Sequence, residues 1–289
     1  MALIDAIQRI PIRGVGISTD VEPDPVWVSD VLRPDYVELI YLQPKVVQAV
    51  ADQFPGTPFE FHHADIEFYE PAGVTQRFVD AARTVIDILH PHWCNVEMGS
   101  MRVGSTLFDQ FIFPFLDTDT LTLMADRLRQ FQAAVPEVLV TFENPAPLWL
   151  CPGGMTLSDY MRQLADATQC GILLDLTHLY SLMQLQHATM NDFAAFPWEY
   201  VVQIHVAGSR AFDKILLDDH TAPIQSGVLA LLAEVLPKCT NIRGVAYEMD
   251  FVSKPIARDM FPQVRRVVER VRPDLQPQAG STLLFRPNL

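Results

Sequence analysis

Histidine and carboxylate side chains recur along this sequence at or just after the ends of short apolar segments. The residues that fit this description are His62, His63, Glu97, Glu143, Asp175, His178, His205, Asp218, His220 and Glu248. Carboxylates that gather in one place repel one another and take raised pKa values unless a cation neutralises them. Mixed imidazole and carboxylate ligands suit iron, manganese or zinc better than calcium. If the fold brings these residues together, the sequence predicts a metal centre.

The residues divide into three candidate metal sites. The first consists of residues that we also expect to be catalytic, namely Glu143, Asp175, His205 and Glu248. The second consists of Asp218 and His220 with His178, and the third of His62 or His63 with Glu97. A single buried histidine or aspartate is more often a hydrogen-bonded structural residue than a ligand. The prediction therefore depends on all of them facing the same place.

Eight short apolar segments, rich in β-branched and aromatic residues, alternate with amphipathic stretches. The segments are 13–18, 36–42, 59–66, 93–99, 138–144, 171–178, 201–208 and 244–251. Between them, stretches such as 74–89, 119–135, 158–167 and 261–271 carry apolar residues at helical spacing. This alternation predicts an α/β fold, a (β/α)8 TIM barrel rather than an open doubly wound sheet. The carboxyl ends of barrel strands meet on one face, where the residues above would fall.

Length and cysteine pattern agree with this fold and limit the chemistry. The 289 residues fit one barrel domain, which we expect over 13–272, followed by an irregular tail over 273–289. The four cysteines are widely spaced and form no CxxC motif, which disfavours a zinc ribbon or an iron–sulfur cluster. No GxGxxG follows a strand and no GxSxG occurs, which disfavours a dinucleotide site and a serine hydrolase triad.

Charge and hydropathy limit the partners. The net charge of -14 argues against nucleic-acid binding through a basic face. The amino-terminal segment lacks the apolar core of a signal peptide, and no apolar stretch approaches the roughly 20 residues needed to span a bilayer. We therefore expect a cytoplasmic protein that binds neither a membrane nor a nucleic acid.

Several motifs, taken in order, resemble those of a known family. They are GVGIS (14–18), FENPAP (142–147), TLSDYMRQLADATQCGILLDLTHLY (156–180), IHVAG (204–208), LLDDHTAPI (216–224) and YEMD (247–250). Together they resemble the multinuclear non-heme iron-dependent oxidases, whose best-known members modify cysteines in ribosomally made peptides. The resemblance covers most of the chain, roughly residues 14–251, and these motifs in order are more specific than any one alone.

The resemblance implies a xylose-isomerase-like barrel that binds two or three iron ions. The ligand positions that it implies are Glu143, Asp175, His205, Asp218, His220 and Glu248, with His62 matching the family's histidine on the third strand better than His63. In this family an iron pair activates dioxygen, which leads to oxidation of an iron-bound substrate cysteine. Members often act with a small partner protein that presents the leader of the peptide.

The sequence departs from the family pattern at several positions, which indicates a divergent branch. Glu97 stands where the family commonly has a histidine on the fourth strand. Thr177 and His178 replace a pair of asparagines after the strand-six aspartate, and Ser209 replaces the histidine of an AGH motif. The number of metal ions, and whether Glu97 and His178 bind them, are therefore left open.

Two other functions fit the same residues. One is a sugar isomerase or epimerase of the same barrel class, in which one divalent ion such as manganese or zinc polarises a hydroxyl or carbonyl group. The other is a barrel that has lost catalysis and serves as a scaffold for a peptide-modifying partner. The LLDDH segment favours the oxidase, because a single-metal sugar enzyme does not need that additional pair of ligands.

Overall fold

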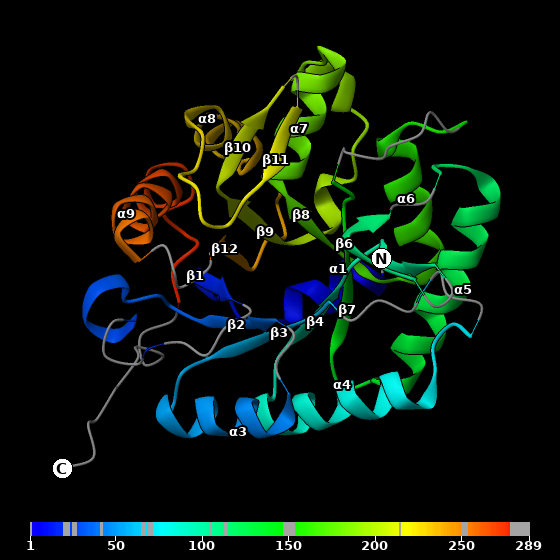
Figure 1. The fold of residues 1–289 in the computed structure, drawn as a ribbon, viewed down its shortest axis with the longest axis horizontal. Helices are drawn as coiled ribbons and strands as arrows, with labels where there is room; N and C mark the ends of the chain where they lie inside the picture. Colours follow the sequence, from blue (N-terminus) through cyan, green and yellow to red (C-terminus); the bar gives the residue numbers. More distant parts are fainter. Residues whose placement is uncertain are drawn as a thin grey trace.

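Eight parallel strands close into a barrel in the computed structural model (Figure 1). The structure describes residues 2–277 except for 20–23, 25–27, 41–42, 65–67, 69–71, 104–105, 113–114, 147–153, 214 and 250–253. The barrel strands are β1 (Gly14–Thr19), β2 (Val37–Ile40), β3 (Phe59–His63), β4 (Trp93–Val96), β7 (Leu139–Glu143), β8 (Gly171–Asp175), β9 (Val201–Ala207) and β12 (Gly244–Glu248). Their order around the barrel is their order in the chain, with β12 pairing β1 to close it. The predicted TIM barrel and its eight strand positions are confirmed.

Helices surround the strands, as Figure 1 shows. They are α1 (Ala2–Arg9), α3 (Pro44–Gln53), α4 (Gln76–Leu89), α5 (Thr118–Ala134), α6 (Leu157–Thr168), α7 (Leu176–Gln186), α8 (Ser226–Val235) and α9 (Lys254–Val271). Three short helical turns join them, η1 (Val28–Leu32), η3 (Met190–Phe193) and η4 (Trp198–Tyr200). None of the helices in the described residues has the length and apolar character that a membrane span requires.

The helix α4 illustrates why these segments fold as they do. Thr75 caps its first turn, because the side-chain oxygen accepts a hydrogen bond from the backbone nitrogen of Phe78 at 3.2 Å. Phe78, Ala82 and Val85 are buried on one face at helical spacing. The helix ends at His90, which adopts the left-handed conformation that commonly closes helices. The apolar face of α4 therefore packs on the barrel while its polar face meets solvent.

Two antiparallel hairpins were not predicted from the sequence. One, β5 (Ser100–Val103) with β6 (Thr106–Ile112), follows β4, and the other, β10 (Ser209–Phe212) with β11 (Ile215–Asp218), follows β9. Both therefore extend from the carboxyl ends of barrel strands, and β11 packs against α7 (Figure 1). The second hairpin ends at Asp218 and so carries a predicted ligand toward the barrel mouth.

The sequence boundaries differ from the structure at one functionally important point. The segment 171–178 is predicted to be a strand throughout, but the strand ends at Asp175 and the helix α7 begins at Leu176. Asp175 causes the change, because its Oδ1 accepts a hydrogen bond from the backbone nitrogen of His178 at 2.7 Å and caps the helix. Asp65 and Asp250, which follow the third and eighth strands, and residues 278–289 of the expected tail lie outside the described residues.

Candidate metal centre

His62, Glu97 and Glu143 form one buried group of the potential ligands that the sequence predicted. His62 Nε2 lies 3.5 Å from Glu97 Oε1 and 3.6 Å from Glu143 Oε2. The three residues come from β3, from the residue after β4 and from the end of β7, so neighbouring strand ends bring them together. One ligand atom from each lies within 4.8 Å of the others, as a shared metal ion requires.

A second group shares Glu143 with the first. Glu143, Asp175 and His205 also offer ligand atoms that lie within 4.8 Å of one another. Asn144 holds Asp175 in place, because its side chain donates to the Asp175 carbonyl oxygen at 3.0 Å and accepts from the Asp175 backbone nitrogen at 2.7 Å. Glu143 is therefore placed where its two oxygens can serve two ions.

The remaining predicted residues form a rim above these groups. Asp218 Oδ2 lies 3.1 Å from His220 Nε2 and 3.5 Å from His178 Nε2. Glu248 Oε2 lies 3.7 Å from His220 Nε2 and 3.2 Å from His205 Nδ1, and so joins the rim to the deeper groups. The side chains of Asp218 and His220 are 25% and 27% exposed, whereas His205 is fully buried. The centre therefore opens to solvent at the rim.

Nine of the ten predicted residues meet at the barrel mouth, and His63 does not. Successive residues of a strand point to opposite faces, so His62 and His63 cannot both face the interior. The His63 ring stacks on Phe78 of α4, with ring centroids 4.2 Å apart and planes 12° apart. Burial lowers the pKa of His63 to about 4, so the ring is a neutral packing group. His63 is thus a core residue between the barrel and α4.

The structure adds Glu38, a residue that the sequence analysis did not single out. It lies in the middle of β2 and is fully buried, and its Oε1 atom is 2.7 Å from His205 Nε2 and 3.9 Å from His62 Nδ1. The sequence analysis considered strand ends, and Glu38 precedes the end of its strand. One signal was available: an acidic residue inside the apolar segment YVELIYL needs a buried partner.

The carboxylates of the centre cannot all be charged without a cation. Burial raises the pKa of Glu143 well above its usual value, and the nearby charges of Glu97 and Asp175 raise it further. Burial also raises the pKa of Asp175 to about 6. Burial would raise the pKa of Glu248 as well, but His220 and His205 outweigh it and lower the value to about 2.

His178 lies close to two acidic side chains, Asp175 and Asp218, which change its pKa. Burial would lower its pKa, but the charges of Asp175 and Asp218 outweigh burial and raise the value to about 10. Its Nδ1 atom lies 3.1 Å from the carbonyl oxygen of Asn144 and 3.3 Å from Glu143 Oε1. With a pKa of about 10 the ring carries a proton on both nitrogens in the metal-free protein, so Nδ1–H can donate to that carbonyl while Nε2–H faces Asp218.

Unsatisfied buried atoms indicate that these residues fit a metal ion. Oε2 of Glu97, Oε2 of Glu143, Oδ2 of Asp175 and Nε2 of His62 are buried without a hydrogen-bond partner among the described residues. Such atoms are costly in a folded protein unless another group satisfies them. Imidazole nitrogens with carboxylate oxygens are ligands that iron, manganese and zinc accept. The donor set therefore suits a transition-metal ion better than an empty polar pocket.

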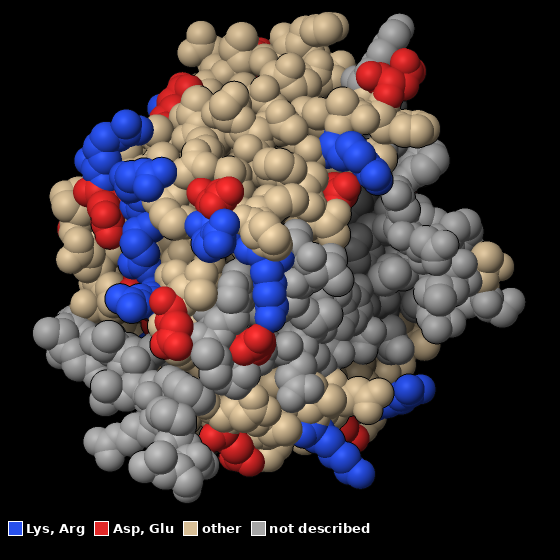
Figure 2. All heavy atoms as spheres, turned by 60° about the vertical axis from the view of Figure 1, so that its left-hand side comes forward, with Lys and Arg blue, Asp and Glu red and all other residues tan. Residues whose placement is uncertain are grey.

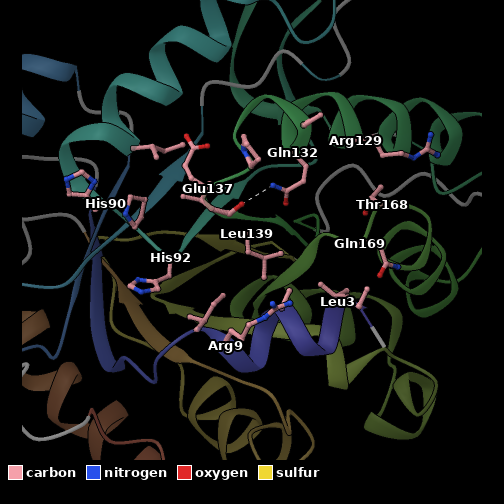
Figure 3. A pocket seen from close by; sticks show the side chains of 18 of the residues that line it. Leu3, Arg9, His90, His92, Arg129, Gln132, Glu137, Leu139, Thr168 and Gln169 are labelled. Atoms are coloured by element: carbon pink, nitrogen blue, oxygen red, sulfur yellow. Dashed lines mark hydrogen bonds between the residues drawn. The ribbon is translucent and has the colours of Figure 1, made fainter.

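A cavity elsewhere in the molecule is separate from this centre. It has a volume of about 980 Å³ and is lined by Leu3 and Arg9 of α1, by His92 and by Leu139, the first residue of β7 (Figure 3). These residues lie at the amino ends of the strands, opposite the cluster. None of the clustered histidines and carboxylates lines it. The cavity's size alone is therefore no reason to place the chemistry there.

Basic and acidic side chains lie close together on one face of the molecule. Figure 2 shows lysine and arginine side chains with acidic ones close by on the face that it presents. On α9, for example, Arg265 lies 2.9 Å from Asp35 and Arg258 lies 3.7 Å from Asp259.

Comparison with other proteins supports the fold and gives the family. In solved structures, the chain resembles a xylose isomerase-like TIM barrel protein from Mycobacterium smegmatis in complex with magnesium (12% identity, 92% of this chain and 98% of that chain, TM-score 0.59). It also resembles the IolI protein with a bound zinc atom (10% identity, 91% and 99%, TM-score 0.58). At these identities, both matches show the fold alone.

Sequence relatives extend over most of the chain. A UPF0276 protein of Pseudomonas aeruginosa is 22% identical over 256 residues, which are 86% of this chain and 89% of that protein. The family model described as RiPP precursor modification enzyme MbnB/TglH/ChrH matches residues 23–271, most of the barrel. The chain therefore belongs to this family of enzymes that modify the precursors of ribosomally made peptides.

Proposed function

We propose that the protein is an iron-dependent oxidase that uses dioxygen to modify a cysteine-containing, ribosomally made peptide. The observation that carries the proposal is the overlap of the ligand groups. His62 and Glu143 belong to one group, Glu143 and His205 to the next, and the rim residues continue the series. A sugar isomerase that polarises one hydroxyl group needs a single such group, whereas a multinuclear oxidase needs several.

The assignment of residues follows from this overlap. Glu143 would bridge two ions, because it is shared by two groups and its carboxylate has two oxygens. His62 and Glu97 would complete one ion, and Asp175, His205 and Glu248 the other. Asp218, His220 and His178 would hold a third ion at the rim. Iron bound in this way would supply the redox chemistry that activates dioxygen and oxidises the substrate cysteine.

The chain's own residues would prepare the site for that chemistry. The buried ends of Glu143 and Asp175 exclude water from the deep groups, since both residues are almost fully inaccessible. The partly exposed Asp218 and His220 mark the side from which a peptide thiol would approach. A peptide substrate fits the family. We also propose that a small partner protein presents the leader of that peptide to the site.

Metal content tests the proposal first. We expect two or three iron ions per chain by elemental analysis of protein purified without oxygen, with Mössbauer spectra showing more than one iron environment. A single manganese or zinc ion would favour the isomerase, and protein that binds no metal even after reconstitution would favour the scaffold. Either result would contradict the proposal that the protein is an iron-dependent oxidase.

Substrate turnover tests the second half of the proposal. The iron-loaded protein would be incubated with a cysteine-containing precursor peptide, with and without dioxygen, and the peptide mass measured. We expect a mass change that needs dioxygen and that maps to a cysteine. The same peptide with serine in place of cysteine is the matched control, and modification of that peptide would contradict the cysteine specificity.

A further inference from the structure

Glu38 differs from the other carboxylates of the barrel mouth in what its oxygens contact. Ser18 Oγ donates to Oε1 at 2.7 Å, and Asn95 Nδ2 donates to Oε2 at 2.6 Å. By contrast, Glu97, Glu143 and Asp175 each have a buried oxygen without a hydrogen-bond partner among the described residues. Each oxygen of Glu38 thus accepts a hydrogen bond from the protein, whereas each of the other three acids has an oxygen that accepts none.

A buried polar network holds Glu38 rigidly. Asn95 Nδ2 also donates to Gln203 Oε1 at 2.6 Å, and the same oxygen accepts from Trp93 Nε1 at 2.7 Å. Gln203 in turn donates from Nε2 to the Tyr36 hydroxyl at 2.9 Å. All of these residues are fully buried. Glu38 lies in β2 and Tyr36 directly before it, Trp93 and Asn95 lie in β4, and Gln203 lies in β9. A network with this many partners fixes the position of the Glu38 carboxylate.

Both ligand histidines face this one carboxylate, His205 within hydrogen-bonding distance and His62 at a longer distance. His205 turns Nε2 toward Glu38 at 2.7 Å and Nδ1 toward Glu248 at 3.2 Å. His62 turns Nδ1 toward Glu38 at 3.9 Å and Nε2 toward Glu97 and Glu143. The His205 contact is within hydrogen-bonding distance, although the ring is not turned for an ideal bond. Each ring thus has one nitrogen toward Glu38 and the other toward different carboxylates of the barrel mouth, Glu248 for His205 and Glu97 with Glu143 for His62.

This arrangement matches a general device of metal sites. A histidine that binds a metal through one ring nitrogen usually donates its other N–H to a carboxylate or carbonyl, which fixes the tautomer and the ring orientation. Removal of such a supporting carboxylate typically weakens metal binding about 10–100-fold. Here Glu38 faces two histidines, and the three residues lie close enough to form a ligand group of their own. Each histidine also belongs to a further group, His62 with Glu97 and Glu143 and His205 with Glu143 and Asp175.

We propose that Glu38 is a positioning residue that holds His62 and His205 in the ring orientations and tautomers needed for metal binding, and so ties two metal positions together. It is not itself a ligand. His205 then binds through Nδ1 and His62 through Nε2, with the N–H of each ring turned to Glu38. This inference rests on the metal centre of the proposed function but not on iron or on dioxygen.

The tautomers can be read directly in the wild-type protein. The full chain would be stripped of metal and loaded with Zn²⁺, a diamagnetic probe, and long-range ¹H–¹⁵N spectra of the histidine rings recorded. We expect the proton on Nε2 of His205 and on Nδ1 of His62. If zinc binds His205 through Nε2, Glu38 is a ligand and the proposal is wrong. If zinc does not bind the chain at all, both this inference and the proposed metal centre fail.

A matched pair of variants tests the role of the carboxylate. Glu38→Gln keeps the size of the side chain but places an amide against the two rings, and should weaken Zn²⁺ binding about 10–100-fold in a chelator competition. Glu60→Gln is the control, because Glu60 is an equally buried acid on the next strand that contacts Arg13 and the backbone of Trp93 instead. Glu60→Gln should leave zinc affinity unchanged. Equal affinities in wild type and Glu38→Gln would overturn the proposal, and the wild-type spectra decide the matter if either variant does not fold.

Discussion

The adjacent histidines of β3 allow one strong test of the structure, since they differ only in the face that they occupy. His63→Ala removes a ring that is 6% exposed and stacked on Phe78 at 4.2 Å. Truncation of a large buried side chain typically costs about 3 kcal/mol, including the cavity that remains. In a chain of 289 residues that cost corresponds to a fall in Tm of roughly 5 °C. The metal content should not change, because the ring points away from the ligand groups.

His62→Ala should have the opposite profile. It removes a ring whose nitrogens make no hydrogen bond within the described residues, so the lost packing is offset by relief of a desolvated polar group. We expect the metal-free protein to change by less than about 1.5 kcal/mol in unfolding free energy. The bound metal should fall by at least one ion per chain, because His62 contacts Glu97 and Glu143.

The assay needs both variants measured in the same way. Thermal unfolding of chelator-treated protein, followed by circular dichroism, gives the change in stability without a contribution from metal. Elemental analysis after reconstitution gives the metal content. Loss of metal in His63→Ala together with full retention in His62→Ala would refute the assignment of the two faces of β3.

Three further predictions concern the metal centre and its rim. Glu143→Gln should lose bound metal without loss of stability in the metal-free state, since the raised pKa of Glu143 favours its neutral form there and glutamine keeps the shape of that form; elemental analysis and urea unfolding measure the two effects, and full metal content would contradict the bridging role. Addition of Fe²⁺ or Zn²⁺ to chelator-treated protein should raise Tm in calorimetry, because an ion at 100 times its Kd that binds only the folded state contributes about 2.7 kcal/mol; an unchanged Tm would count against a built site. Gly208→Ala would place a Cβ 1.9 Å from the carbonyl oxygen of Ala222, so we expect a cost of about 1–3 kcal/mol and displacement of the hairpin that carries Asp218, with loss of one ion. Gly154→Ala, which meets no described atom within 4 Å, is the control and should change neither stability nor metal content.

The sequence predicted the barrel well because hydrophobic periodicity is a local property. Each of the eight segments is apolar and bounded by polar residues, and the structure places a strand in every one. The hairpin Ser209–Asp218 was missed because its two strands have only four residues each and lack the alternation that a local pattern detects. Its position is set by the contact of β11 with α7, which no local pattern contains.

One rule explains both which of the predicted site residues the structure brings together and which it separates. The rule that chemistry lies at the carboxyl ends of strands found His62, Glu143 and Glu248, since these residues end or follow their strands. The rule could not distinguish His62 from His63, although strict alternation with the apolar Phe61 would have assigned His63 to the outer face. It also passed over Glu38, which lies one layer deeper in the barrel.

Hydrogen-bond satisfaction separates the buried acids of the barrel interior into two kinds. Glu60, toward the amino ends of the strands, accepts from Arg13 Nε at 2.6 Å and from the backbone of His92 and Trp93. Glu38, one layer above, accepts from Ser18 and Asn95. Both acids are therefore complete without an ion.

The next layer is different, because the protein leaves its acids incomplete. Glu97, Glu143 and Asp175 each retain a buried oxygen without a donor in the described part of the chain. An unsatisfied buried oxygen costs roughly 1–3 kcal/mol, so several of them in one layer are tolerated only if another species satisfies them. Along the barrel axis, the buried acids thus change from ones that accept hydrogen bonds from the protein to ones that need a cation. Glu38 belongs with the acids that accept hydrogen bonds from the protein.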